Sequence, residues 1–514
     1  MNLKKKLIPA LIAPLVLGLS FSGQALANDS DELEKLRSLV QELDQKVRIL
    51  DRKGELADEA AAAKKKETPV VKASQDGFGL ESADGKNKIK FKALAQIDYR
   101  NYQDAGAGND AKNIDGFDFR RIRPSIEGTV FGKYDFRFTP EFGESKTANA
   151  TSTSGIVDAY VDARFTPYFQ VRAGKFKPYV GLERLQSGSD IKFIERSYVS
   201  NNILPNRDLG VSVHGDLFGD KLTYAAGVFN GVVDGGDNIT SQDTNGDKGY
   251  AVRVFTTPFK DSDNLLAGLG FGLAATHDAF DGTSSSTGLP GYKTAGQQAT
   301  FFNYNNKAAS AATVTWGGAG GITPTAVAAV KSDIVVATGD RNRYAPQAYY
   351  YYGPFGVIAE YAVVEQGVKN IGTGVNSANA ALNTQAANLK NDAWQIAGSW
   401  LITGEDASFK GATKPKRAFD VDGSGWGAWE LVARYQENNI DDAAFTKNNF
   451  ANITTSAKSA KTWGLGVNWY LNQNIKLATN YEETSFEGGG GGTVTAPIDR
   501  ADEKALFTRL QVSY

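Results

Sequence analysis

The chain has no cysteine, one methionine and only two histidines among its 514 residues. Without cysteine it forms no disulfide, so an exported form must be stabilised by its size, its partners or an unusual solvent. Two histidines exclude a histidine-rich metal centre and provide few bases that could activate a nucleophile. The composition therefore predicts no catalytic residue, no metal site and no cofactor.

Long apolar runs are also absent, except at the N-terminus. There, three lysines at positions 4–6 precede an apolar stretch at 7–19, and a small-x-small cleavage site ends at Ala27. We expect a secretory signal peptide over residues 1–27. The alternative, a membrane anchor, is disfavoured because the run is short and interrupted by proline. The formal net charge of −2 becomes −5 once these three lysines are removed, so an anion preference must come from where the basic residues lie.

A heptad pattern follows over residues 28–53. Its apolar positions alternate spacings of three and four, at Leu33, Leu36, Val40, Leu43, Val47 and Leu50. Charged residues lie between them, which is typical of a coiled-coil seam. About three heptads precede Gly54, so the coil would be marginal unless an assembly brings the chains together. We predict an oligomerisation stalk, with a solitary helix docked on the body as the alternative, and a linker over residues 54–77.

From residue 78 to residue 514 the hydrophobic period changes to two. In KIKFKALAQIDYR, residues 88–100, apolar side chains occupy the odd positions and polar ones almost all of the even positions. Similar runs occur at 133–139, 157–165, 209–216 and 463–469. This alternation predicts strands with one apolar and one polar face, which a soluble sandwich would also show.

Three further features favour a transmembrane β-barrel over a sandwich. Aromatic residues repeatedly lie near strand ends, as in membrane-interface girdles. Long polar segments at 234–249, 281–331 and 367–392, typical of outer loops, alternate with tight connections, typical of periplasmic turns, and the chain ends within an alternating run, LFTRLQVSY. We predict an all-β fold, a closed antiparallel barrel of about 16 strands at ~25–30 residues for each strand with its connection, because lipid cannot satisfy an open sheet edge. Such a barrel encloses a water-filled lumen.

The polar faces would line this lumen and lean towards basic residues. In FDFRRIRPSIEG the alternation slips, because Phe117 and Phe119 share the parity of Arg121 and Arg123. A β-bulge at Arg120 and Arg121 would restore the phase and direct both guanidiniums into the pore. We expect all three arginines of this run to be pore residues. The alternative places them at the barrel rim, where they would reach lipid head groups.

The stretch GLERLQSGSDIKFIER, residues 181–196, lacks alternation and follows a strand and a turn. It is long enough to be a constriction loop folded into the lumen near residues 178–200. There Arg184, Lys192 and Arg196 would be anion donors, with hydroxyls from Ser187 and Ser189. Guanidinium matches phosphate oxygens, and anion pores use rings of basic residues. The alternative is an outer loop whose charges pair with its own acidic residues.

These segments together resemble the phosphate-selective porins O and P, most clearly over residues 78–231. The resemblance rests on FRRIRPSIEG, on VDAYVDARF, on RAGKFKPYVGLERLQS, and on FIERS followed by PNRDLGVSVHG. It implies a trimeric barrel of 16 strands in the outer membrane of a Gram-negative bacterium, with an N-terminal periplasmic segment. The heptads would then form a three-helix stalk.

In that family, phosphate is held midway along the pore by a basic residue of an inward loop, by serines just after it, and by an arginine twelve residues on. The resemblance places this set on Arg184, Ser187 and Arg196. Two departures bear on phosphate affinity: the family's basic residue is a lysine, and its paired serines read Ser187-Gly188 here.

The resemblance also places the family's inward aspartate on Asp158, and part of its ladder of outer arginines on Arg120 and Arg121. It implies an anion-selective channel for the uptake of phosphate or polyphosphate by diffusion. The partners it implies are inorganic phosphate or other small anions, outer-membrane lipid and lipopolysaccharide, and further copies of this chain in a homotrimer. Nucleic acid is not an expected partner.

Three other functions fit parts of the sequence. A general or carboxylate-type diffusion porin would use the same barrel and is the main alternative. An outer-membrane enzyme would need a Ser–His pair, yet His214 lies two residues from Ser212 on one strand face, which is more typical of a lumenal surface. An adhesin or purely structural barrel would show no conductance.

Overall fold

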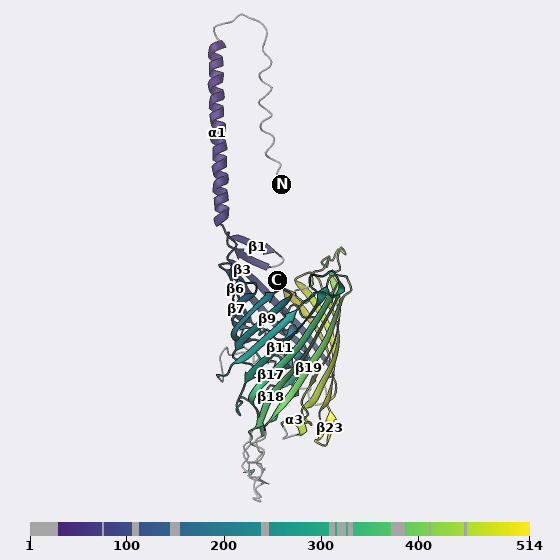
Figure 1. Cartoon of the computed structure of the whole chain (residues 1–514). Coiled ribbons are helices and arrows are strands. Elements are labelled where there is room, and N and C mark those ends of the chain that lie inside the picture. Colours follow the sequence, from purple (N-terminus) through teal and green to yellow (C-terminus); the bar gives the residue numbers. More distant parts are fainter. Residues whose placement is uncertain are drawn as a thin grey trace. The chain divides into compact units, whose positions relative to one another are not determined.

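The computed structural model describes residues 29–74, 77–104, 113–143, 155–237, 246–307, 314–315, 325–326, 333–371, 386–410, 413–446 and 450–514. The chain divides into two units between Thr68 and Pro69 (Figure 1). The predicted signal peptide, residues 1–27, lies outside the described residues.

The first unit contains one long helix, α1 Asp29–Glu67. Its predicted seam is exposed in the single chain, with Leu36 67% and Leu50 66% accessible. The sequence predicted that the helix ends at Gly54. In the structure it continues into the predicted linker. One glycine inside a helix costs only about 1 kcal/mol, and the alanines at 60–63 have the highest helix propensity. Among the helices of the described residues, none is both long and apolar enough to cross a bilayer.

The second unit begins with a hairpin of β1 Val70–Ser74 and β2 Gly77–Glu81. Strand β2 pairs with the start of β3 Lys88–Asp104, from Phe78↔Phe91 to Glu81↔Lys88. Ordered structure in this unit therefore starts within the predicted linker, ahead of residue 78.

A closed barrel makes up most of the second unit. In the described part of the chain, sixteen antiparallel strands form its wall: β3, β4 Gly116–Val130, β5 Tyr134–Glu141, β6 Gly155–Thr166, β7 Phe169–Phe176, β8 Asp208–Leu217, β9 Leu222–Phe229, β10 Gly249–Thr256, β11 Leu269–Ala279, β17 Asp333–Tyr352, β18 Phe355–Asn370, β19 Ala386–Leu401, β20 Ala428–Asn439, β21 Ala457–Tyr470, β22 Ile475–Thr493 and β24 Glu503–Ser513. Strand β24 pairs with β3, from Ser513↔Leu94 to Lys504↔Asp104, and closes the barrel as predicted.

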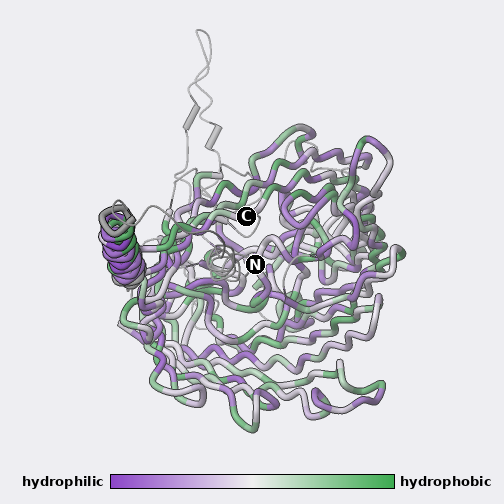
Figure 2. The backbone as a smooth tube through the Cα atoms, turned by 90° about the horizontal axis from the view of Figure 1, so that it is seen from above, coloured by the Kyte–Doolittle hydropathy of each residue, from purple (hydrophilic) through white to green (hydrophobic). Residues whose placement is uncertain are grey.

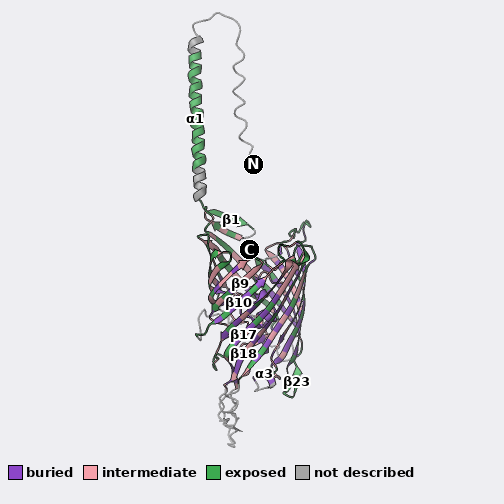
Figure 3. Ribbon diagram, in the orientation of Figure 1, coloured by how far each residue is buried: buried purple, intermediate pink, exposed green. Residues whose placement is uncertain are grey.

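The wall has an apolar outside and a polar inside. Buried and exposed residues both occur along its strands (Figure 3). Along β3, Phe91 is 44% and Ile97 36% exposed, whereas Gln96 and Asp98 are completely buried. Figure 2, which looks along the barrel, shows this alternation of hydropathy around the wall and further chain inside it. A soluble protein has the reverse arrangement, so the wall fits a lipid exterior and a polar interior.

Several connections enter the barrel in the described part of the chain. Among them are residues 177–207 between β7 and β8, residues 280–307 between β11 and β17, and residues 407–410 between β19 and β20, and Asp234 between β9 and β10 also reaches inward to Arg343 at 2.7 Å. The second contains the short strands β12 Tyr292–Lys293, β13 Thr300–Phe302 and β14 Asn306–Lys307, and its Tyr292 and Phe302 are buried in an aromatic and aliphatic cluster with Tyr198. The sequence predicted residues 281–331 as an outer loop. The buried aromatic area explains why the described part of this loop turns inward.

Smaller elements complete the described chain: the 3-10 turn η2 Leu265–Gly268, the hairpin strands β15 Val314–Thr315 and β16 Thr325–Ala326, the short helix α3 Ala443–Thr446, and β23 Ala496–Asp499, which pairs with the end of β22.

Candidate anion pathway

The connection from Lys177 to Arg207, called the lumenal segment below, lies inside the barrel and contains the helical turns α2 Leu182–Leu185 and η1 Val199–Ile203. Inward-facing side chains of the opposite wall accept hydrogen bonds from its backbone at 2.6–2.8 Å: Glu360 of β18 from Leu182, Gln436 of β20 from Tyr198, and Asn480 of β22 from Ile194. These contacts hold it across the lumen, so it is not an outer loop.

Strand β4 carries the bulge that the sequence predicted. The β3–β4 register slips at Arg120, which is the extra residue. The Nε of Arg120 lies 2.7 Å from Oε1 of Glu195 in the lumenal segment, and Nη1 of Arg121 donates to Oε1 of Gln96 at 2.6 Å. Both guanidiniums therefore point into the barrel, and not to lipid head groups at the rim.

Glu195 is the centre of a buried set of ion pairs, called the Glu195 cluster: Asp98, Arg100, Arg120, Glu195 and Arg509. Arg100 reaches Glu195 at 2.6 Å and Asp98 at 2.8 Å, while Arg509 reaches Asp98 at 2.6 Å. The cations of this cluster all have a carboxylate partner. Asp118 adds a third carboxylate 4.0 Å from Arg100, so three arginines face three carboxylates. These pairs fix the lumenal segment to β3, β4 and β24 and leave no net positive excess for a passing ion.

The two arginines predicted to bind the anion are buried within the lumenal segment. Arg196 Nη2 donates to the carbonyl oxygen of Gln186 at 2.8 Å, and Arg184 Nη2 contacts the carbonyl oxygen of Ser200. Neither arginine is among the residues that line the cavity described below. Their donors are directed to the backbone, and their predicted role in anion binding stays a prediction.

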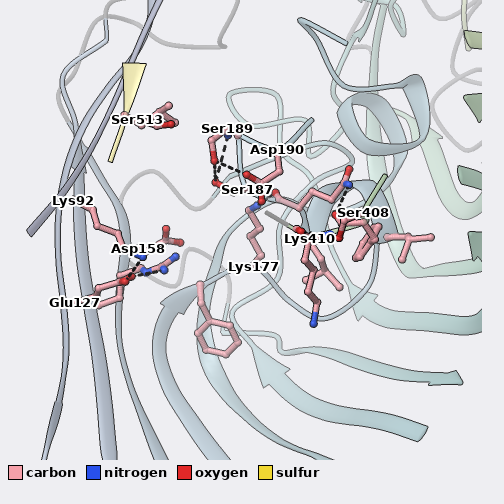
Figure 4. Close-up of a pocket in the computed structure, with 18 of the residues that line it drawn as sticks. Lys92, Glu127, Asp158, Lys177, Ser187, Ser189, Asp190, Ser408, Lys410 and Ser513 are labelled. Atoms are coloured by element: carbon pink, nitrogen blue, oxygen red, sulfur yellow. Dashed lines mark hydrogen bonds and ion pairs between the residues drawn. The ribbon is translucent and has the colours of Figure 1, made fainter. Parts of the chain in front are cut away.

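The hydroxyl groups and the lysine of the same prediction lie in different surroundings. Ser187 is exposed and its Oγ is 2.8 Å from that of Ser189, which in turn lies 2.8 Å from Oδ1 of Asp190 (Figure 4). Lys192 does not reach this group, because it pairs with Glu430 of β20 at 2.9 Å.

On the side of the short turns, the lumenal segment forms one wall of a cavity of about 1420 Å³, called the basic cavity. Figure 4 shows Lys92, Asp158, Lys177 and Lys410 around it. Eleven basic residues line it: Lys90, Lys92, Arg123, Arg137, Arg172, Lys177, Arg207, Arg253, Lys260, Lys410 and Lys414. Five acidic residues line it: Glu127, Asp158, Asp190, Asp216 and Asp220. The cavity is therefore strongly basic, although the chain as a whole is slightly acidic.

About half of these cations are neutralised by a nearby carboxylate: Lys92 and Arg137 by Glu127, Arg123 by Glu141, Arg172 by Asp162, Arg207 by Asp158 and Lys260 by Asp220. Four others have no carboxylate within 4.0 Å among the described residues: Lys90, Lys177, Arg253 and Lys410. Two residues predicted to line the pore, Arg123 and Asp158, are each part of one of these ion pairs.

Lys177 and Arg196 donate hydrogen bonds to the same backbone carbonyl oxygen. Its Nζ donates to the carbonyl oxygen of Gln186 at 2.7 Å, the same oxygen that Arg196 binds. We call Lys177, Gln186, Ser187 and Arg196 the Gln186 cluster. Burial and the neighbouring Arg196 hold the pKa of Lys177 well below its ordinary value, and burial and Arg184 lower the pKa of Arg196 to about 9. Asp158 and Glu183 offset these shifts only in part, so a positive potential remains that a bound anion would relieve.

Comparison with known proteins identifies the barrel. The profile described as phosphate-selective porin O and P matches residues 89–514. The chain belongs to this family. Porin O of Pseudomonas aeruginosa is 23% identical over 452 residues, which cover 86% of this chain and 92% of that protein.

Solved outer-membrane channels align along most of the porin as well. The channel DcaP of Acinetobacter baumannii gives a TM-score of 0.45 with 11% identity, over 86% of this chain and 99% of that one. Pseudomonas putida OprB gives 0.46 with 8% identity, over 84% of this chain and 95% of that one.

As a member of this family the protein is an outer-membrane porin, a channel. His214, the residue weighed as a catalytic base, instead lies 3.0 Å from Oδ1 of Asp162 and stacks near Tyr179, with ring centroids 5.1 Å apart. Within the described residues, no group of three or more histidines and carboxylates could hold a metal ion.

Sequence reasoning missed three members of the pathway: Lys177, Gln186 and Arg207. Lys177 has the parity of Phe169, Val171 and Ala173 on the apolar face of β7, so the alternation does not indicate that it faces the lumen, while Arg207 directly precedes β8. The only sequence signal for Lys177 is its place before Pro178, where the strand must end because proline has no amide to donate.

Proposed function

We propose that this porin is an anion-selective diffusion channel for inorganic phosphate or polyphosphate and that it catalyses no reaction. The observation that carries the proposal is that four cations of the basic cavity, Lys90, Lys177, Arg253 and Lys410, have no carboxylate within 4.0 Å among the described residues. A confined wall of one charge concentrates counter-ions and excludes ions of its own sign. The family and its Porin O relative supply phosphate as the expected anion.

We place the anion at the Gln186 cluster, with Lys177 as its direct donor. Lys177 lines the basic cavity and donates to a neutral carbonyl, so its charge is available to an incoming anion. The exposed hydroxyl of Ser187 lies beside it. In this proposal Arg184 and Arg196 act indirectly: they order the backbone of the lumenal segment and add to the positive potential.

Arg121 adds to that potential from behind the segment. A side chain at Gly188 would approach its Nε to 3.3 Å, so the glycine lets this guanidinium lie against the loop. The same contact accounts for a glycine where the family resemblance leads one to expect a second serine. On the other side, Asp158 and its partner Arg207 moderate the field, and weak binding is what allows an ion to leave a pore.

We infer that the porin is a homotrimer in contact with outer-membrane lipid and lipopolysaccharide, and that α1 is a periplasmic coiled-coil stalk. The exposed seam of α1 supports the stalk, because the heptad leucines and valines have no apolar partner within the described part of their own chain. Such residues are buried when copies of the helix associate.

The test is a phosphate titration of the chloride current through the purified porin in a planar bilayer. Phosphate should block the wild-type current, and Lys177→Gln should raise the half-blocking concentration about tenfold, because one charge-assisted contact is lost. Lys260→Gln is the matched control: this lysine lines the same cavity but pairs with Asp220 at 3.4 Å, so the block should be unchanged. Absence of phosphate block in the wild type would favour a general or carboxylate-type porin.

A further inference from the structure

One part of the wall of the basic cavity is aromatic, and glycines of β11 make room for it. Gly270 and Gly272 lie between Phe255 of β10 and Tyr349 of β17. A Cβ atom on Gly270 would lie 2.7 Å from both rings. Because that atom is absent, the two rings meet across β11 with centroids 5.2 Å apart.

The connection between β19 and β20 extends this surface. Its Phe409 stacks on Tyr349, with centroids 4.9 Å apart and planes 19° apart, and Tyr351 packs edge-on against Tyr349 at 5.5 Å. The carbonyl oxygen of Phe409 accepts a hydrogen bond from Gln186 Nε2 at 2.8 Å. We call Phe255, Tyr349, Tyr351 and Phe409, which all line the cavity, the aromatic wall.

Arg253 is the cation beside this wall. It is 8% exposed, its Nε donates to Gln347 Oε1 at 3.1 Å, and its Cζ lies 4.5 Å from the centre of the Phe255 ring. Among the described residues no carboxylate lies within 4.0 Å of it and no partner binds its terminal amino groups. The carboxylate of Glu360, on β18, is already bound by Leu182 and Gln395.

We propose that Arg253 and the aromatic wall form a subsite for organic anions with a planar apolar body, the simplest being an aromatic carboxylate. The guanidinium would bind the carboxylate through its terminal amino groups while the ring lies against Tyr349 and Phe409. The proposal rests on the proposed function, because the ligand must enter as a permeating anion.

The chemistry separates this subsite from the Gln186 cluster. Inorganic phosphate has no apolar surface and gains nothing from aromatic rings, whereas an aromatic carboxylate buries its ring and adds an offset-stacked contact. A guanidinium held over a ring also keeps its fork free to bind a planar carboxylate. The cavity therefore offers two kinds of anion site on different residues.

The experiment compares benzoate with acetate as blockers of the chloride current. In the wild type, benzoate should half-block the current at about a tenfold lower concentration than acetate. Arg253→Gln and Phe409→Ala should each reduce this preference about threefold or more, and so should Gly270→Ala, which changes no charge but displaces both rings. Phe409→Ala and Gly270→Ala, which change no charge, should leave the half-blocking concentration of phosphate unchanged.

Lys410→Gln is the control, because it removes an unpaired cation of the same cavity that has no aromatic contact among the described residues. It should leave the benzoate preference unchanged. Equal block by benzoate and acetate in the wild type, or a preference that survives all three wall variants, overturns the subsite. Loss of phosphate block with the benzoate preference intact would overturn the proposed phosphate function and not the subsite.

Discussion

Two neighbouring clusters of the lumenal segment contain similar basic residues with opposite electrostatic effects. In the Glu195 cluster, Arg100 and Arg120 converge on one carboxylate at 2.6 and 2.7 Å. In the Gln186 cluster, Lys177 and Arg196 converge on one neutral carbonyl oxygen at 2.7 and 2.8 Å. The first arrangement cancels charge and the second leaves it. A count of basic residues in a pore wall therefore says less about selectivity than their partners do.

The largest expected effect comes from removing the carboxylate of the first cluster. Glu195→Gln leaves Arg100 and Arg120 buried without this partner, and breaking a buried ion pair typically lowers stability by about 3–5 kcal/mol. The thermal transition of the folded barrel in detergent, followed by its heat-dependent gel mobility, should fall clearly. Asp190→Asn changes an acidic residue of the same segment beside the cavity and should leave the thermal transition nearly unchanged. Equal stability of the two variants would show that the Glu195 cluster does not anchor the segment.

A medium effect is expected from converting a paired cation into an unpaired one. Asp158→Asn frees Arg207, whose Nε lies 2.9 Å from the carboxylate, and should raise the anion-to-cation permeability ratio about twofold. The reverse change, Arg207→Gln, leaves Asp158 unpaired and should lower the ratio. Reversal potentials in a salt gradient measure both. Shifts in the same direction would contradict the view that pairing decides which charges act on ions.

The smallest expected effect is that of pH. Because the pKa of Lys177 lies well below its ordinary value, this lysine loses its proton at a lower pH than ordinary lysines do. Phosphate block should therefore weaken as the pH rises and strengthen as it falls, since the protonated form binds the anion. In Lys177→Gln the dependence should be much flatter. An equally steep dependence in that variant would assign the titration to another group.

The strand pattern of the body could be predicted from the sequence because lipid and lumen impose a period of two. The same rule located the bulge at Arg120, where the phase slips, and the closure of β24 on β3. The rule failed at Val157, which the alternation of residues 157–165 places on the apolar outer face. A second register shift, between Thr139 and Pro140 of the neighbouring strand, leaves Val157 buried. A one-residue shift of the register turns the side chains beyond it to the other face of the sheet.

The contacts inside the lumen could not be predicted in the same way. The sequence identified Arg184 and Arg196 as cations of an inward loop, yet it does not encode that they donate to carbonyl oxygens of that loop. Those partners lie 10 and 16 residues away along the segment, so they depend on how the whole segment folds. For the same reason the inward position of residues 407–410, and with it that of Phe409, has no local signal.

The most direct test of the account is the sign of the reversal potential of the wild-type porin across a potassium chloride gradient, measured beside Lys177→Gln. The account predicts a reversal potential with the sign expected for an anion-selective channel, because unpaired cations line the cavity. It also predicts a clear shift towards the value expected for cation selectivity when Lys177 is neutralised. A cation-sided wild-type potential, or no shift in the variant, would contradict the claim that the unpaired cations of the lumenal segment set selectivity.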